Sequence, residues 1–379
     1  MTYDVAIAGL GGIGSAIAAH CATRGASIIG VEQFEPAHDR GASHGKSRMI
    51  RQAYFEDPAY VPLVLRSFEL WRTLEEKTRE RLLQITGVLS VGEENAEIIA
   101  GTKRAAAQHH LQLETWSRKE LRQNCPAVRM LPDEVALFEP EAGVLDPERA
   151  VSAHLSVART GGAHLQFETR IRAWEADERA VALHFENGAS LSARTLILSL
   201  GPWFKETLEA LGVPLRVQRN VQAWFSPSVP SYQAGRFPAF LLDRAGLPAP
   251  LYGFPDFGDG VKAAFHGFGQ LTTADTVDRE VDMIRDVAPI VAALEEWMPG
   301  AAAKFREAKP CMYSLTPDSN FVIDRHPRHP HVILCGGFSG HGFKFAPVVG
   351  EIAADLALDG QSRHQIDFLS LKRFRTRSC

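Results

Sequence analysis

Apolar residues at the N-terminus form an extended run, a glycine-rich turn, a helical spacing and a second extended run. Residues 5–8 (VAIA) lead into Gly9-Leu10-Gly11-Gly12-Ile13-Gly14, and after a helical segment the run over 26–31 ends at Glu32. Strands of a parallel sheet are continuous apolar runs, and a helix joins each to the next. The pattern therefore predicts a strand–helix–strand unit at the start of the chain.

Similar patterns return further along. Residues 195–200 (TLILSL) are a continuous apolar run that ends at a Gly-Pro turn, and 332–335 are followed by a glycine-rich turn and a helix over 347–358. The other predicted elements are helices over 62–77 and 146–160, a mixed, partly helical segment over 103–123, a strand over 88–91, a hairpin of 181–185 with 190–193 around Asn187-Gly188, and a polar loop over 39–46.

Residues 216–310 have a different pattern. Short β-like runs alternate there with Pro and Gly turns, which predicts an antiparallel sheet with one helix near 277–296. The β-rich insertions separate the α/β segments, so we expect an α/β fold with a second, α+β domain. The predicted boundaries are 1–85, 146–212 and 311–379 for a discontinuous Rossmann-like domain, and 86–145 with 213–310 for the second domain.

The glycine-rich turn has the spacing of a dinucleotide-binding fingerprint. Gly9 permits a tight turn, Gly11 lets a pyrophosphate approach the helix N-terminus, and Gly14 allows close packing of helix on strand. Glu32 is suited to accept the ribose hydroxyls of adenosine and disfavours the 2′-phosphate of NADP. The motif does not separate FAD from NAD, and a turn that only packs helix on strand is the alternative.

Composition narrows the class of protein. The chain has 379 residues, a net charge of −4 and 45% hydrophobic residues, which argues against non-specific nucleic-acid binding. No run of 18 apolar residues predicts a transmembrane helix, and the first strand leaves no room for a signal peptide. The cysteines are few, odd in number and without paired spacing, so we expect neither a disulfide framework nor a metal site, and a cytoplasmic protein: Cys21, Cys125, Cys311, Cys335 and Cys379.

Three polar clusters could carry chemistry. Arg48 and Arg51 lie in a loop of small residues, and their guanidinium groups suit a phosphate or carboxylate, although a solvated basic loop is the alternative. Lys344 lies between two aromatic residues after a glycine-rich turn, where it would meet an anion unless its stem reaches solvent. Cys311, in the run KPCMY, is by itself most simply a small buried residue.

Taken together, these segments resemble the monomeric sarcosine oxidase family of flavoprotein amine oxidases. The resemblance covers nearly the whole chain and is carried by GASHGKSRMIRQAYFED (41–57), CMYSLTPDSNFVIDRHP (311–327) and GFSGHGFKFAPVVGEIAADL (337–356). It looks closest to the pipecolate oxidase or peroxisomal sarcosine oxidase branch. The chain departs from the bacterial pattern at Lys46-Ser47, where Asp-Thr is common, and at Met49.

The resemblance implies that the dinucleotide is FAD. Cys311 matches the cysteine that forms a thioether to the flavin 8α-methyl, and Arg51 with Lys344 matches the pair that binds the substrate carboxylate. The first domain is then the FAD-binding domain and the second the substrate domain. The further matches are Tyr252 and Tyr313, which line the substrate cavity, Gly340 and His341 beside the carboxylate site, and Gly342, Lys344 and His44 near the flavin.

Three matches imply catalytic roles. Lys262 and Arg48 match basic residues that flank the flavin, and Lys262 corresponds to the residue implied in oxygen activation. His266 matches an active-site histidine.

The implied reaction has two halves. A secondary amino acid such as sarcosine is oxidised to an imine, and oxygen then reoxidises the flavin and yields hydrogen peroxide. L-Pipecolate or N-methyltryptophan specificity, a dehydrogenase with another electron acceptor, and a flavin-binding protein without turnover are the alternatives. The expected partners are the amino acid and oxygen, without nucleic acid or membrane, and the family name suggests a monomer.

Overall fold

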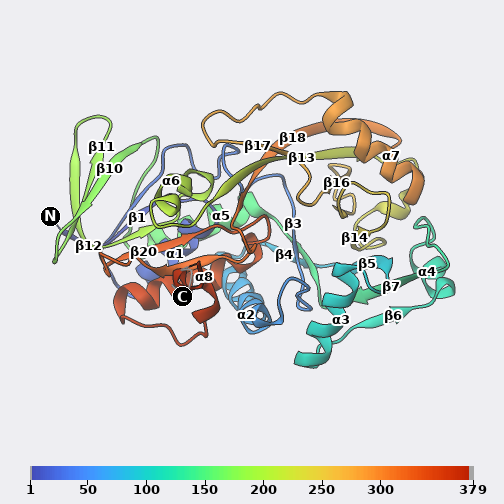
Figure 1. Ribbon diagram of the computed structural model, residues 1–379, viewed down its shortest axis with the longest axis horizontal. Coiled ribbons are helices and arrows are strands. Elements are labelled where there is room, and N and C mark those ends of the chain that lie inside the picture. The colour runs from blue at the N-terminus through green and yellow to red at the C-terminus, as the bar shows by residue number, and fades with distance from the viewer. Residues whose placement is uncertain (1, 375–379) are drawn as a thin grey trace, which may run out of the picture.

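The computed structural model describes residues 2–374. Most of the strands in this range belong to one of two large sheets (Figure 1). An eight-stranded sheet lies in the left half of Figure 1 and a nine-stranded sheet in the right half. Within residues 2–374 no helix is both long and apolar enough to cross a membrane. Four cysteines in this range are buried and unpaired, whereas Cys379 lies outside the described residues.

The N-terminal strand–helix–strand unit forms the middle of the eight-stranded sheet. β1 (Thr2–Ala8) pairs in parallel with β2 (Ile28–Val31) on one side and with β12 (Ser190–Leu198) on the other. β9 (His164–Gln166) extends the parallel array beyond β2, and β20 (Val332–Gly336) extends it beyond β12. The predicted unit and the predicted strand over 332–335 are confirmed.

β12 differs from the prediction because it is one strand rather than two. Its first half pairs antiparallel with β11 (Val181–Phe185), and its second half pairs in parallel with β20. The hairpin at Asn187-Gly188 is confirmed, but the predicted break near 194 is wrong, and the strand ends at Leu198 rather than Leu200. Two different partners use one edge of a continuous strand, which periodicity does not reveal. The remaining strands of this sheet are β10 (Ile171–Ala176) and β19 (Val322–Arg325).

Two helices lie on the parallel strands, and two more pack against those helices. α1 (Gly12–Thr23) contacts both α5 (Pro147–Thr160) and α8 (Ala346–Leu358), and α2 (Val61–Thr78) contacts α8. Asp146 accepts a hydrogen bond from the Arg149 backbone, which confirms the predicted start of α5. Shorter helical segments are α6 (Lys205–Glu209), η1 (Pro58–Tyr60), η2 (Gly201–Phe204), η3 (Pro230–Tyr232), η5 (Phe343–Phe345), η6 (Asp367–Leu369) and η7 (Leu371–Phe374).

The second sheet is mostly antiparallel, as predicted, although β14 and β5 pair in parallel. Its order is β17 (Gln270–Thr272), β13 (Arg216–Ser226), β16 (Val261–Phe265), β15 (Leu251–Phe254), β14 (Ala239–Asp243), β5 (Val88–Glu93), β7 (Glu134–Glu139) and β6 (Glu114–Trp116). β18 (Lys304–Leu315) pairs with the edge of β13 that β16 and β17 leave free. The mixed segment contains α3 (Glu97–His109), β6 and α4 (Arg118–Asn124).

The helix expected near 277–296 begins later than predicted. A π-helical turn, η4 (Met283–Val287), leads into α7 (Ala288–Trp297). The Asp282 carboxylate accepts hydrogen bonds from the backbones of Ile284 and Arg285, and this cap sets the start.

A three-stranded sheet of β3 (Arg48–Ile50), β8 (Gly143–Leu145) and β4 (Leu83–Ile85) carries the segment that leads to Arg51. The domain boundaries stay a prediction, and β18 runs across the one placed between residues 310 and 311.

Replacing Gly14 by alanine should destabilise the fold strongly. A Cβ there would lie 1.8 Å from the Gly9 carbonyl oxygen, a backbone atom that cannot move aside. We expect the free energy of unfolding in urea to fall by about 3 kcal/mol. Gly11→Ala is the matched control, because its Cβ would meet nothing nearer than the Ser43 hydroxyl at 3.9 Å. Equal losses in the two variants would contradict this packing.

Candidate functional site

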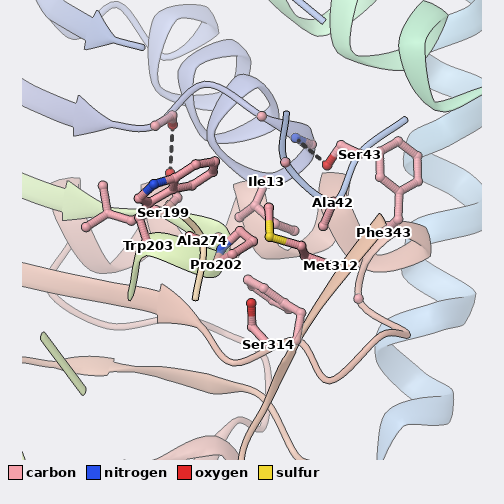
Figure 2. A pocket seen from close by; sticks show the side chains of 18 of the residues that line it. Ile13, Ala42, Ser43, Ser199, Pro202, Trp203, Ala274, Met312, Ser314 and Phe343 are labelled. Atoms are coloured by element: carbon pink, nitrogen blue, oxygen red, sulfur yellow. Dashed lines mark hydrogen bonds between the residues drawn. The ribbon is translucent and has the colours of Figure 1, made fainter. Parts of the chain in front are cut away.

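A cavity of about 890 Å³ extends from the β1–α1 turn to β18 and the β20–α8 turn. Figure 2 shows part of its wall, where Ile13, Ser43, Met312 and Phe343 come from segments far apart in the sequence. The predicted site residues on the wall are Gly9, Gly11, Glu32, Arg48, Arg51, Tyr252, His266, Cys311, Tyr313, Gly340, His341, Gly342 and Lys344. Gly14, His44 and Lys262 are not among its lining residues.

The turn after β1 is shaped to leave room for a ligand. Gly9 has a φ of +87°, and a Cβ on it would lie 2.5 Å from the Ser199 carbonyl oxygen. The Ser199 hydroxyl donates to the Gly9 carbonyl at 2.8 Å, and the Ser43 hydroxyl accepts from the Gly12 backbone at 3.0 Å (Figure 2). The space beside Gly11 is open to the cavity. This geometry fits the role predicted for each glycine.

Glu32 lies at the end of β2, beside this turn. One carboxylate oxygen accepts from the Leu10 backbone at 2.8 Å and the other from the Phe34 backbone at 3.2 Å. These contacts fix a buried acid at the rim of the same cavity.

Arg48 connects the loop after β2 to Cys311. Its guanidinium donates to the Ala42 carbonyl at 2.9 Å and to the Gln222 side-chain oxygen at 3.3 Å, and lies 3.8 Å from the Cys311 sulfur. The structure thus places a positive charge directly beside the thiol.

Lys262 lies behind this loop rather than on the cavity wall. Its ammonium donates to the carbonyls of Gly45 at 2.7 Å and Ser47 at 2.9 Å, and it is 1% exposed. Burial, together with nearby Arg48, holds the pKa of Lys262 well below its ordinary value. Lys262 therefore anchors the Arg48 loop, and its predicted part in oxygen activation stays a prediction.

Arg51 and Lys344 place two cationic side chains on one buried wall. Both are 5% exposed. Arg51 donates to the two Glu56 carboxylate oxygens at 3.0 and 2.9 Å, and the Lys344 ammonium donates to the His341 carbonyl at 2.9 Å. Burial and the positive charge of Arg51 together lower the pKa of Lys344 to about 7, against the opposing effect of the Glu56 carboxylate. Burial would raise the pKa of Glu56, but Arg51, His341 and Lys344 outweigh it and hold this pKa at about 2.

A neutral aromatic group faces the clamp formed by Arg51 and Lys344. His266 Nδ1 lies 3.3 Å from the Tyr313 hydroxyl, and the rings of His266 and Tyr252 meet edge to face at 6.3 Å. Burial lowers the pKa of His266 to about 4 and raises the pKa of both tyrosines. This part of the wall is therefore uncharged at neutral pH.

The sequence did not predict several residues of the site. Glu56 follows Arg51 within the family-like run, which was the available signal for it. Glu139, at the end of β7, accepts hydrogen bonds from the backbones of Gln52 and Ala53, and no sequence signal links these segments. Within residues 2–374 no group of His, Cys, Asp and Glu side chains is arranged to hold a metal ion.

Comparisons with known proteins agree with this geometry. The sequence profile of the FAD dependent oxidoreductase family matches residues 4–356. The chain is 42% identical over 378 residues to "Monomeric sarcosine oxidase" of Streptomyces avermitilis, covering 98% of each chain. It is 33% identical to "N-methyl-L-tryptophan oxidase" of Yersinia pestis, covering 99% of this chain and all of the relative.

Solved structures show the same fold. NikD, described as an unusual amino acid oxidase essential for nikkomycin biosynthesis, superposes with a TM-score of 0.87 at 22% identity over 97% of each chain. L-Proline dehydrogenase from P. horikoshii superposes with a TM-score of 0.85 at 21% identity over 98% of each chain.

The residues around the cavity fit FAD. Besides the turn at Gly9 and Gly11, buried polar atoms on and behind the cavity wall have no partner among residues 2–374: Gln222 Nε2 on the wall, and both His44 ring nitrogens and Asn220 Oδ1 behind it. Burial holds the pKa of His44 well below its usual range, so this imidazole is neutral and can accept as well as donate. Unpaired buried polar groups are costly unless a ligand meets them.

The affinity for a simple carboxylate should depend on pH through Lys344. Below a pH of about 7 the ammonium is present and binds the anion directly, whereas above it binding must take up a proton. We expect the dissociation constant of acetate, read from calorimetry, to be lowest between the pKa of acetate itself, about 4 to 5, and the pKa of Lys344, and to rise up to about tenfold per pH unit above the latter. The other groups that face the site do not change charge in this range: burial lowers the pKa of His266 to about 4 and that of His341 to about 3, and nearby cations hold the pKa of Glu56 at about 2. Lys344→Met should bind acetate weakly at every pH, and an unaltered pH profile in that variant would remove Lys344 from the clamp.

Proposed function

The chain belongs to the FAD dependent oxidoreductase family, and we propose that it is an oxidase of N-methyl or cyclic secondary amino acids that produces an imine and hydrogen peroxide. One arrangement carries this proposal. The carboxylate clamp of Arg51 and Lys344 opens onto the cavity that also contains the dinucleotide turn and Cys311. A flavin-binding protein without turnover would not need such a clamp beside its cofactor.

Arg51 and Lys344 bind the substrate carboxylate, and this fixes the amine and its neighbouring C–H bond over the cofactor site. Positioning of this kind removes a large part of the entropic barrier. FAD supplies, when bound, the acceptor for the two electrons taken from the C–N unit. The Arg51 guanidinium already forms an ion pair with Glu56, so an incoming carboxylate must share Arg51 with Glu56 or displace it.

His266, Tyr252 and Tyr313 surround the amine without adding charge. The neutral His266 imidazole can accept a hydrogen bond from the substrate amine. Arg48 provides a positive charge that favours electron transfer to oxygen, and Lys262, when protonated, adds to it from behind the loop. Water then hydrolyses the imine.

We also propose that Cys311 attaches FAD covalently. The support is the neighbouring Arg48 guanidinium, 3.8 Å from the sulfur, and the position of Cys311 on the cavity wall. A monomeric state and a cytoplasmic location remain predictions from the sequence.

Acid precipitation tests the attachment. Purified protein denatured in acid should give a yellow pellet, because a thioether survives unfolding, whereas Cys311→Ala should release its flavin to the supernatant. Cys335→Ala is the matched control, since Cys335 is a buried thiol of β20 outside the cavity lining. A colourless wild-type pellet would refute attachment while leaving FAD binding intact.

A substrate panel tests the reaction. Hydrogen peroxide should form with some of sarcosine, larger N-methyl amino acids, L-pipecolate and L-proline, and the matching amines without a carboxylate should react poorly. Arg51→Ala should raise KM for every carboxylate substrate about 100-fold, because a charged hydrogen-bonding partner is lost. Arg66→Ala, which breaks a similar ion pair with Glu351 outside the cavity, is the control. Substrate oxidation with an artificial acceptor but without peroxide would favour the dehydrogenase alternative.

A further inference from the structure

The Tyr54 ring lies close to both cations of the clamp. The Arg51 guanidinium carbon is 5.1 Å from the centroid of the Tyr54 ring, and the Lys344 ammonium is 5.0 Å from the same centroid. Tyr54 is fully buried and is not among the residues that line the cavity. Its ring therefore contacts both cationic groups without forming part of the wall that meets a substrate.

An aromatic ring has a negative face that attracts cations within about 6 Å, and the attraction strengthens where water is excluded. Arg51 and Lys344 repel one another, and within their surroundings Glu56 is the carboxylate that pairs with Arg51. A second source of negative potential at the clamp is thus the Tyr54 ring. Phe55 contributes to Arg51 alone, with its ring centroid 4.2 Å from the guanidinium.

Packing of neighbouring rings fixes the Tyr54 ring, and its hydroxyl adds a hydrogen bond. His341 Nε2 lies 3.0 Å from the Ser319 carbonyl, which can only accept, so Nε2 carries the proton and Nδ1 is the acceptor. The Tyr54 hydroxyl accordingly donates to His341 Nδ1. Neighbouring rings, Tyr60 at 5.1 Å and Phe345 at 5.1 Å, pack around it.

We propose that Tyr54 is a positioning residue, whose ring holds Arg51 and Lys344 together as a preformed carboxylate clamp. The clamp then needs no rearrangement of its two cations when a carboxylate arrives. This inference rests on the proposed function only in taking a carboxylate as the ligand of Arg51 and Lys344.

Tyr54→Leu should weaken carboxylate binding and leave the chemical step nearly intact. We expect KM and the acetate dissociation constant to rise about fivefold, with kcat changed less than about twofold. The pH above which acetate binding weakens should fall by about half a unit, because the Lys344 ammonium loses a stabilising neighbour. Arg51, Glu56, His341 and His266 also face Lys344, and all four remain in this variant.

Two further variants separate the ring from generic packing. Tyr54→Phe keeps the ring and loses the bond to His341, so its pH profile should match that of the wild type and its KM should stay within about twofold. Tyr60→Leu removes an equally buried neighbouring tyrosine that contacts neither cation, and its KM and pH profile should also be those of the wild type. If Tyr54→Leu does not fold, trifluorophenylalanine at position 54 preserves the shape and weakens the ring's negative face.

The outcomes are distinguishable. Loss of acetate affinity in Tyr54→Phe equal to that in Tyr54→Leu, or in Tyr60→Leu, would overturn the inference, as would an unmoved pH profile in the leucine and fluorinated variants. If wild-type protein binds no acetate at any pH, the carboxylate clamp itself fails and the proposed function with it. If wild type binds acetate as expected and oxidises no secondary amino acid, the proposed function fails while the role of Tyr54 is still measurable.

Discussion

The positively charged side chains of Arg51 and Lys344 lie together on one buried wall, and the surrounding contacts stabilise them there. Isolated buried ions are very costly, so a pair of cations with one carboxylate needs compensation from dipoles, aromatic faces and a ligand. Glu56 balances Arg51, and the His341 carbonyl receives the Lys344 ammonium. When Lys344 is protonated the group has one positive charge in excess, which is the charge that a substrate carboxylate would neutralise.

The same constraint links the clamp to the cofactor end of the cavity. One stretch of chain, residues 43–56, carries Ser43 against the dinucleotide turn, Arg48 against Cys311, and Arg51 in the clamp. Its shape is imposed from two sides, by a helix and by a strand of the nine-stranded sheet. Glu148, at the start of α5, accepts from the Gly45 backbone at 2.6 Å, while Lys262 from β16 holds the Gly45 carbonyl at 2.7 Å. A change in this stretch must therefore affect cofactor and substrate groups together.

The fingerprint was predictable because each of its residues acts locally. Gly14 is required by an atom five residues away, and the Asn187-Gly188 hairpin by its own backbone conformation. The single strand β12 was not predictable, because its continuity depends on which partners approach each half. The late start of α7 was not predictable either, because the cap at Asp282 sets it and helical periodicity does not.

The site, too, was predictable only in part. Periodicity and composition indicated candidates such as Arg51, Lys344 and Cys311, but each also had a purely structural interpretation. Only the resemblance to a known family gave them roles. The contacts that prepare those residues join segments remote in sequence. Glu139 reaches the backbone of Gln52 and Ala53 from another sheet, and His341 meets Tyr54 across most of the chain. Such pairs have no local pattern, so a single sequence does not disclose them.

Charge is confined to one end of the substrate region, and this has a chemical consequence. Burial lowers the pKa of His266 to about 4 and that of Lys344 to about 7, since a cation in this cavity loses its hydration. The same burial acts on any amine held beside these groups. An amino acid bound through its carboxylate is thereby biased towards its neutral amine. That form has the free electron pair that oxidation requires, so the burial that lowers the pKa of Lys344 in the clamp also prepares the amine.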